Sequence, residues 1–416
     1  MARPRHVAAL ISALQFRNPR PELLRTLDDA EWKQLLAYSD PARLTLICDR
    51  AWHKLLPNWV RDRVARNLAD NTERLARALH AYQELAEVMR RAGAEHLVLK
   101  GFSQWPHFVS DLRLRPQADL DIYCPEGSLQ LAQRAAISIG YQQGAPGENH
   151  IADHLPLLVR PEGRHWRGNA FDPELSQAIE LHHRFWGRPY ARFGPRNLEG
   201  FWERRRTCSV GGIQFDALDP LDAFTYASLH ALRHLLYGGL APASVHEIGF
   251  FLHENAEDEP LWDVWRARHD EQLRCLTAIS ALLASRWFGC RLPSAVENEI
   301  NRLPPIVSRW IGSFGDAALV NPYRLDKRAL WLQLGLIESE RDRFSVLCRR
   351  LFPLWIPPLD SRWVQEGPDA VENAVHTPRG LMLKYATYFG WFATRVTRHL
   401  RVLPSTLWYG LRLWSS

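Results

Sequence analysis

Hydrophobic and polar positions follow two different periods along this chain, and each period predicts a different element. Between residues 67 and 91, apolar side chains recur every three or four positions, which is typical of an amphipathic helix. Residues 97–99 form a short apolar run that predicts a buried strand. Residues 129–139 return to the helical period, with an expected end at Gly140. This succession of helix, strand and helix predicts an α/β core.

Two acidic residues interrupt the next apolar run. Asp119 and Asp121 alternate with Leu120 and Ile122, so in a strand the carboxylates share one face and the apolar side chains share the other. Aspartate is depleted from strand interiors, and neighbouring carboxylates repel unless a cation lies between them. The pair therefore predicts a Mg²⁺ site, because Mg²⁺ takes one or two carboxylates and fills its other positions with water and substrate phosphate. A lone Asp-x-Asp motif in a solvated turn is the alternative.

A third acid follows about sixty residues later, in residues 178–185. If this segment is a strand, Glu180 and His182 share a face while its apolar residues enter a core. Were the two strands neighbours, Asp119, Asp121 and Glu180 could hold two Mg²⁺ ions about 4 Å apart. One ion would activate an attacking hydroxyl and the other would stabilise leaving pyrophosphate. His182 by itself is more typical of a buried hydrogen-bonded histidine than of a catalytic base.

These motifs together resemble a known family. They are Lys100-Gly101, then Arg115-Pro116 with Asp119 and Asp121, then Glu180-Leu181-His182. In this order they resemble the bacterial nucleotidyltransferases of the DNA polymerase β superfamily, in particular a branch with Lys-Gly as its glycine signature and Glu-Leu-His around the third acid. The resemblance covers about residues 40–260. It implies a polymerase β-like core with a mixed sheet.

The resemblance also implies a role for each matching residue. Asp119, Asp121 and Glu180 would be the catalytic metal ligands, and Gly101 with Ser103 would contact the phosphates. Three further positions match the family as candidate cofactor-binding residues and charge partners: Lys100, Arg115 and His182. The implied reaction transfers a nucleoside monophosphate from an NTP, with ATP expected, to a hydroxyl of a small molecule, peptide or protein. The implied cofactor is Mg²⁺, with Mn²⁺ as the alternative metal.

One departure from the family pattern motivates a rival function. Phe102 follows the signature glycine where the branch has a small residue, and its bulk would narrow a phosphate-binding loop. The alternative is therefore a catalytically degenerate scaffold or docking subunit that keeps the fold. His230 and His234 lie four residues apart on an expected helix, a spacing that also fits a metal site. Without a third ligand, we expect them to support the active site instead.

Length and composition are consistent with an enzyme of several modules. The chain has 416 residues, 46% of them hydrophobic, and its six cysteines form no Cys-x-x-Cys pair. No window approaches the ~20 apolar residues of a membrane span, so we expect a cytoplasmic protein. The expected regions are a helical region (1–92), the nucleotidyltransferase core (93–215), a helical region completing the active site (216–300) and a C-terminal helical region (301–416).

The C-terminal tail concentrates the positive charge. No acidic residue follows Glu372, whereas six basic residues do, a number equal to the formal net charge of +6. The interpretation we favour is a helix over residues 381–403 that packs its aromatic face on the body and shows arginines to water. The alternative is docking on a protein partner or on an anionic membrane, at the inner face of the cell membrane. Nothing in the tail indicates sequence-specific binding of nucleic acid.

Overall fold

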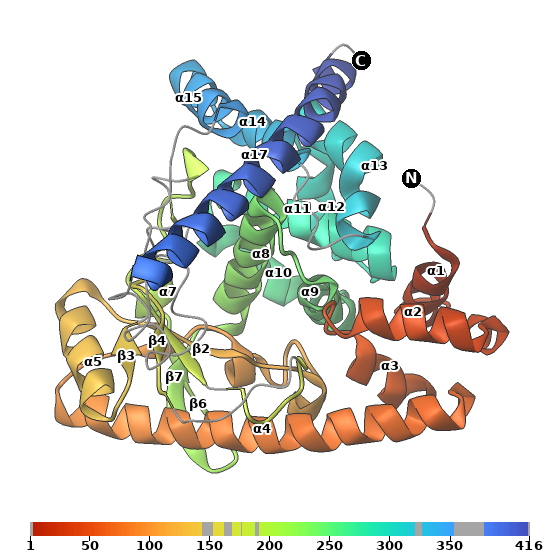
Figure 1. The fold of residues 1–416 in the computed structure, drawn as a ribbon. Coiled ribbons are helices and arrows are strands. Elements are labelled where there is room, and N and C mark those ends of the chain that lie inside the picture. Colours follow the sequence, from red (N-terminus) through yellow and green to blue (C-terminus); the bar gives the residue numbers. More distant parts are fainter. Residues whose placement is uncertain are drawn as a thin grey trace.

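The computed structural model describes residues 3–143, 153–161, 169–175, 177–187, 191–320, 327–352 and 378–414. In these residues a seven-stranded mixed sheet lies among many helices, which confirms the predicted α/β class (Figure 1). The order of the strands across the sheet is β3-β4-β5-β2-β1-β7-β6. Their bounds are β1 Leu97–Val98, β2 Asp119–Tyr123, β3 Gln142–Gln143, β4 Leu158–Val159, β5 Ala178–His182, β6 Arg206–Val210 and β7 Ile213–Ala217.

The helices precede, cover and follow this sheet. The α-helices are α1 Arg5–Ala13, α2 Asp29–Ser39, α3 Thr45–Trp52, α4 Asn58–Arg91, α5 Glu126–Ser138, α7 Gly200–Glu203, α8 Pro220–Tyr237, α9 Pro242–Glu254, α10 Glu259–Arg268, α11 Glu271–Phe288, α12 Ser294–Asn301, α13 Pro305–Val320, α14 Ala329–Leu336, α15 Glu340–Leu351 and α17 Pro378–Trp414. The 3-10 helices are η1 Pro21–Thr26, η2 His53–Leu55, η3 Gly101–Gln104 and η4 Leu112–Leu114. No helix in the described part of the chain is both long and apolar enough to cross a membrane.

Strands β2 and β5 are parallel neighbours in the middle of the sheet. Their register places Asp121 opposite Glu180 and Tyr123 opposite His182. Because side chains alternate along a strand, the acids of both strands lie on the same face of the sheet. The adjacency on which the predicted site depended is therefore present.

The opposite face of the sheet is apolar and is covered by α4 and α5. Leu120, Ile122, Ile179 and Leu181 are fully buried there, in one cluster with side chains of both helices. Figure 1 shows α4 running the length of this side of the sheet, with α5 beside it. Burying each of these aliphatic side chains contributes about 1.5–3 kcal/mol, which fixes the register of β2 and β5. The two strands therefore present their acids to the other side, toward α8.

The helix α4 begins earlier than the sequence pattern predicted, at Asn58 after Pro57. The polar residues 70–72 lie inside the helix. Asn71 is buried and its side-chain amide donates to the carbonyl of Arg113 at 2.7 Å. Arg74 is also buried and donates to the carbonyl of Ala170 at 2.6 Å. These polar groups bind the loops around the sheet and do not end the helix.

The first turn of α8 contains a buried carboxylate. Asp222 accepts two hydrogen bonds from Arg204, at 2.8 and 2.9 Å, and its Oδ1 lies 3.0 Å from Nε2 of His269. Burial alone would raise the pKa of Asp222, but the His269 and Arg204 contacts outweigh it and hold that pKa below the usual range. The carboxylate therefore joins the start of α8 to Arg204, just after α7, and to His269, just after α10.

Replacing Asp222 with asparagine is expected to lower the free energy of unfolding by about 3 kcal/mol, because Arg204 and His269 lose a buried counter-charge. The loss, measured by urea unfolding, should be largest above the unfolded carboxyl pKa of about 3.9 and shrink as the pH falls through the lower folded-state pKa. Asp263→Asn, in an exposed pair with Arg266, is the control and should cost less than about 1 kcal/mol. Equal stability of the two variants would contradict this role of Asp222.

Candidate active site

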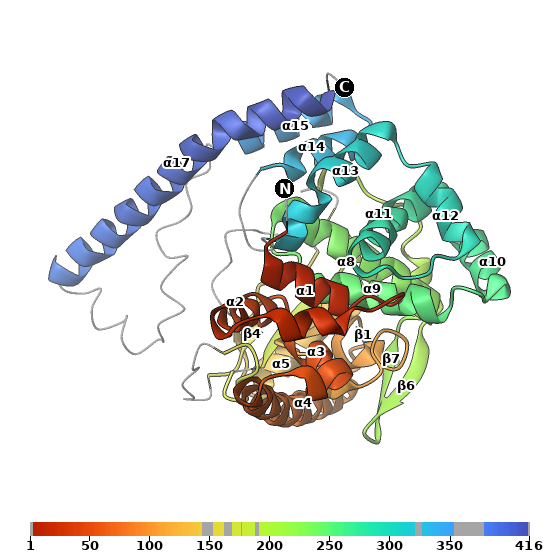
Figure 2. The ribbon, with the colours of Figure 1, turned by 90° about the vertical axis from the view of Figure 1, so that its right-hand side faces the viewer.

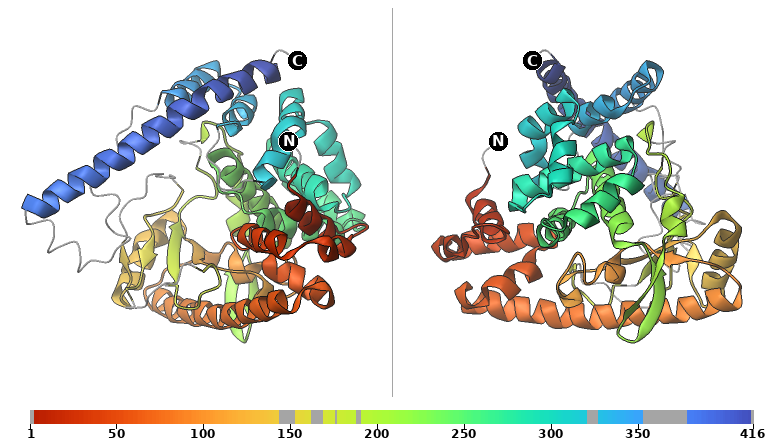
Figure 3. Two further views of the ribbon diagram at one scale, coloured as in Figure 1. Left: turned by 45° about the vertical axis from the view of Figure 1, so that its right-hand side comes forward. Right: turned by 180° about the vertical axis from the view of Figure 1, so that it is seen from behind.

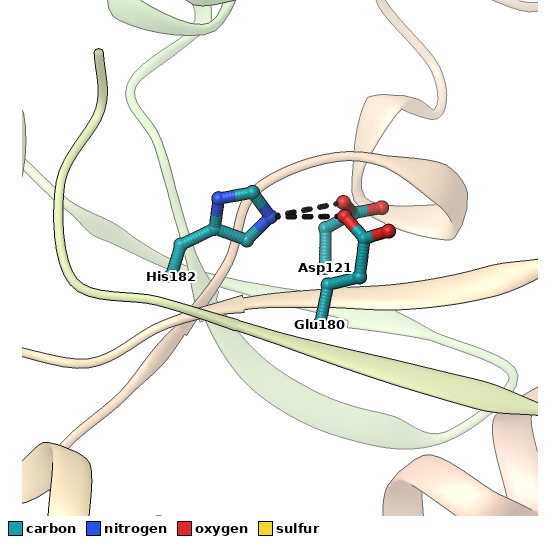
Figure 4. Close-up of side chains that lie close together, drawn as sticks. All are labelled: Asp121, Glu180 and His182. Carbon is teal, nitrogen blue, oxygen red and sulfur yellow. Dashed lines mark hydrogen bonds and ion pairs between the residues drawn. The ribbon is translucent and has the colours of Figure 1, made fainter. Parts of the chain in front are cut away.

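Three side chains converge on the acidic face of the sheet. Nε2 of His182 lies 3.2 Å from Oδ1 of Asp121 and 3.4 Å from Oε2 of Glu180 (Figure 4). One ligand atom from each residue falls within 4.8 Å of the others. Asp121 and His182 are buried, whereas Glu180 keeps part of its side chain exposed. In the described part of the chain this is the one cluster of histidine, cysteine or acidic residues compact enough for a metal ion.

Lys100 supplies positive charge beside this cluster. Its Nζ lies 3.1 Å from Oδ1 of Asp121 and 3.0 Å from Nε2 of His230. Burial alone would lower the pKa of Lys100, but the charges of Asp121, Asp119 and Glu180 outweigh it and raise the pKa above its usual value. The lysine is therefore a permanent cation next to the carboxylates at physiological pH.

His182 is a second cation between the two acids. Burial by itself would lower its pKa, but contacts with Asp121 and Glu180 raise it to about 9. Burial would raise the pKa of Glu180, whereas His182 and Lys100 together lower it to about 2. The same cations lower the pKa of Asp121 against the effect of burial. Both carboxylates are therefore ionised, and His182 and Lys100 balance their charge.

Helix α8 lines the side of the site that faces the acids. Nε2 of His234 lies 3.1 Å from Nε2 of His230, which in turn contacts Lys100. Burial and the nearby cations hold the pKa of His230 well below its ordinary value and lower that of His234 to about 3, so both rings are neutral. The two histidines thus lie beside the site and contact the lysine, as expected for a supporting role.

A buried ion pair on the α8 side of the site was not predicted from the sequence. Arg233 pairs with the carboxylate of Asp153, and both side chains are at least nine-tenths buried. The backbone carbonyl of Asp153 accepts hydrogen bonds from the amides of His183 and Arg184, just after β5. Neither Asp153 nor Arg233 belongs to a motif that the sequence analysis singled out. The pair fixes the end of β5 against α8.

Asp119 lies apart from the three-residue cluster, although it shares their face of the sheet. It is half-buried at the start of β2, and its charge contributes to the raised pKa of Lys100. Its backbone carbonyl accepts a hydrogen bond from the side-chain amide of Gln117 at 2.9 Å. The structure therefore brings Asp121, Glu180 and His182 together most closely, with Asp119 near them.

Gly101 begins the short helix η3 immediately after Lys100. It is buried with φ = +84°, and a Cβ atom at this position would lie 2.5 Å from Nε2 of Gln117. A side chain here would push away the amide that holds the start of β2. The glycine is thus required both by its backbone conformation and by its close contact with Gln117.

Gly101→Ala is expected to lower the free energy of unfolding by about 2 kcal/mol, because alanine is strained at positive φ and would displace Gln117. The matched control is Gly127→Ala on α5, where a Cβ meets nothing within 4 Å. That control should be neutral or stabilising by up to about 1 kcal/mol. Thermal and urea unfolding of both variants measure the difference. If Gly101→Ala leaves the free energy of unfolding unchanged, position 101 does not require glycine.

The expected effect of Phe102 on a phosphate loop is wrong. Its ring is fully buried and packs edge-on against Tyr82 and Phe215, at centroid distances of 5.3 and 5.0 Å. These residues belong to the apolar cluster on the α4 side of the sheet. The bulk of Phe102 therefore fills the core, away from the acids. Ser103, the next residue, is half-buried within η3.

Arg115 lines a pocket that does not include the residues of the acidic cluster. Its Nε is 3.0 Å from Oε1 of Glu247 on α9, and both side chains are largely buried. The pocket encloses about 530 Å³ of empty space, including its solvent-filled mouth, between the segment that precedes β2, α3 and the start of α9. Arg115 thus has a carboxylate partner of its own, and Glu247 belongs to this pocket.

Comparison with known proteins gives one match. The sequence model of a family described as uncharacterised nucleotidyltransferase matches residues 28–289. This region runs from the start of α2 to the end of α11 and includes the whole sheet and the acidic cluster. No curated protein and no solved structure matches the chain.

Proposed function

The chain belongs to the uncharacterised nucleotidyltransferase family, and on that premise we propose that it transfers a nucleoside monophosphate from an NTP to a hydroxyl group and releases pyrophosphate. ATP is the proposed donor, and the acceptor is a small molecule, peptide or protein. The observation that carries the proposal is the parallel register of β2 and β5, which aligns Asp121 with Glu180 beside Lys100. We assign the sheet and its flanking helices to a polymerase β-like core.

The donor atoms fit a divalent cation that binds nucleotides. Asp121 and Glu180 offer carboxylate oxygens, the ligands that Mg²⁺ and Mn²⁺ prefer, and Asp119 offers another on the same face. We assign Asp119 and Asp121 as the residues that would hold the metal bound to the nucleotide, and Glu180 as a third metal ligand on the side of the acceptor hydroxyl. When bound, the metal would neutralise part of the negative charge of the phosphates. His182 would position Asp121 and Glu180, which it already contacts.

The remaining chemistry is positioning and electrostatics supplied by the chain. Lys100 places a fixed positive charge beside Asp121, suited to the negative charge of a triphosphate. Glu180 is ionised and partly exposed, so it can accept a hydrogen bond from the acceptor hydroxyl and orient it. With so low a pKa it is a weak base, and orientation is its main contribution. Gly101 and Ser103 would contact the phosphates next to Lys100.

The experiment uses NTPs labelled at either the α- or the γ-phosphate. The purified chain is incubated with Mg²⁺, each labelled NTP and a mixture of small-molecule and protein acceptors. Transfer of the α-label, with the γ-label appearing only in pyrophosphate, supports the proposal. Transfer of the γ-label would identify a phosphoryl transferase. Absence of any transfer, together with no Mg²⁺-dependent binding of NTP, would support the degenerate scaffold.

A further inference from the structure

The C-terminal helix α17 carries a stripe of exposed apolar side chains. Its members are Phe389, Val396, Leu400, Leu407, Leu411 and Trp414, at successive spacings of 7, 4, 7, 4 and 3 residues. At 100° per residue these positions fall within about 60° of arc. Leu400 is 59% exposed and Trp414 is 49% exposed. Of the 13 large apolar side chains exposed in the described residues, seven belong to this helix, so the stripe is not ordinary surface.

A different face of α17 packs on the protein. Thr406 and Leu413 are buried, and the carbonyl of Thr406 accepts a hydrogen bond from the indole of Trp331 at 2.9 Å. Further contacts join His399, in the middle of the helix, to the carbonyl of Leu351 at the end of α15, and Tyr409 to Phe314 of α13. Figures 2 and 3 show the N-terminal part of α17 projecting beyond the rest of the molecule. The favoured expectation, an aromatic face packed on the body with arginines exposed to water, is met at Tyr409, which packs against Phe314, but not by the exposed stripe.

Positive charge lies on the side of the helix opposite the stripe. Arg395, Arg398, Arg401 and Arg412 are exposed there, each at least about 80° from the nearest member of the stripe by helical geometry. The sequence has no acidic residue after Glu372. The helix is therefore amphipathic, with the stripe and the arginines on different sides and the exposed Trp408 between them.

We propose that α17 binds flat on the surface of a bilayer that contains anionic phospholipid. The apolar stripe would enter the boundary between headgroups and acyl chains, and the arginines would reach the phosphates. Each arginine near such a surface strengthens binding by roughly fivefold, from about 1 kcal/mol. A second copy of the chain is a poorer partner for the stripe. The α17 helix of a second copy offers no acidic residue that could pair with these arginines.

The test is co-sedimentation of the full chain with vesicles of phosphatidylglycerol and phosphatidylcholine, and with vesicles of phosphatidylcholine alone. Binding to the anionic vesicles is expected, with a marked decrease at high salt. The double variant R398E/R401E should bind at least about thirtyfold more weakly, from the loss of two cations. Its control, R66E/R134E, makes the same change in net charge at exposed positions of α4 and α5 and should bind like the unchanged protein.

A second pair of variants tests whether the apolar stripe contributes to vesicle binding. L400S/L407S, at two exposed positions of the stripe, should lose binding several-fold, whereas I137S/V264S, at exposed apolar positions elsewhere, should not. Circular dichroism checks that each variant keeps its helices. Absence of binding to anionic vesicles, or equal losses in the controls, would overturn the proposal. Self-association that L400S/L407S abolishes, without vesicle binding, would instead assign the stripe to a second copy.

Discussion

Replacing Asp121 with asparagine is expected to reduce nucleotide transfer by at least about 10³-fold. Asp121 is the most buried acid of the cluster, and its Oδ1 is shared by Lys100 and His182. Asparagine keeps the shape but removes the charge that would hold a divalent cation, and the loss of one well-placed electrostatic group costs about 10²–10³-fold. Loss of the metal adds to that cost. The measurement is the rate of α-label transfer per folded protein.

The same variant should also be less stable. From the sequence alone, relief of repulsion between Asp119 and Asp121 predicts an intact or slightly stabilised Asp121→Asn variant. The structure changes that expectation, because Lys100 and His182 already compensate the charge of Asp121. Removing one partner of such a buried group costs about 3–5 kcal/mol.

The control for the activity measurement is Asp216→Asn on β7, in the same sheet but outside the cluster, and this variant should keep activity. Full activity of Asp121→Asn would refute the site.

Replacing Glu180 with glutamine is expected to lower turnover about 100-fold while changing NTP affinity less than about threefold. Glu180 keeps 22% of its side chain exposed, whereas Asp121 keeps 2%, so Glu180 is the more accessible to an acceptor. The loss of turnover corresponds to a missing hydrogen-bond acceptor and charge for the hydroxyl. Turnover and equilibrium binding of NTP are measured on the same preparation.

The control for this variant is Glu95→Gln, an exposed acid that pairs loosely with Arg205. It should change neither quantity. If NTP affinity falls as much as turnover in Glu180→Gln, the residue belongs to the metal shell of the nucleotide and does not act on the acceptor side. If neither falls, Glu180 has no part in the reaction.

The sequence pattern predicted the strands that carry the acids because local rules govern them. The alternation of Asp119 and Asp121 with apolar residues, and of Glu180 with Ile179 and Leu181, follows from the two-residue period of a strand. Leu120, Ile179 and Leu181 are buried in the core, which confirms the predicted alternation. The adjacency of β2 and β5 is a long-range contact, which no local period contains. The resemblance to a known family supplied the expectation of a shared site.

Other features could not be predicted because partners distant in the sequence create them. Lys100 was a candidate cofactor-binding residue and charge partner, but its contact with Asp121 depends on the pairing of β1 with β2, and its contact with His230 depends on the position of α8. Phe102 was predicted to narrow a loop, yet its direction depends on which side of the sheet α4 covers. Asn71 and Arg74 donate hydrogen bonds to carbonyls of loops that lie far away in the sequence, which no local pattern contains. The positions of the expected region boundaries stay predictions.

The most direct test of the proposed chemistry is calorimetric titration of the purified full chain with each NTP, in the presence and in the absence of Mg²⁺. We expect one or more NTPs to bind with Mg²⁺ present, and binding to disappear when Mg²⁺ is omitted or when Asp121 is replaced by asparagine. Failure of every NTP to bind, or binding with equal affinity without Mg²⁺ and in Asp121→Asn, would contradict a nucleotidyltransferase site at Asp121, Glu180 and His182.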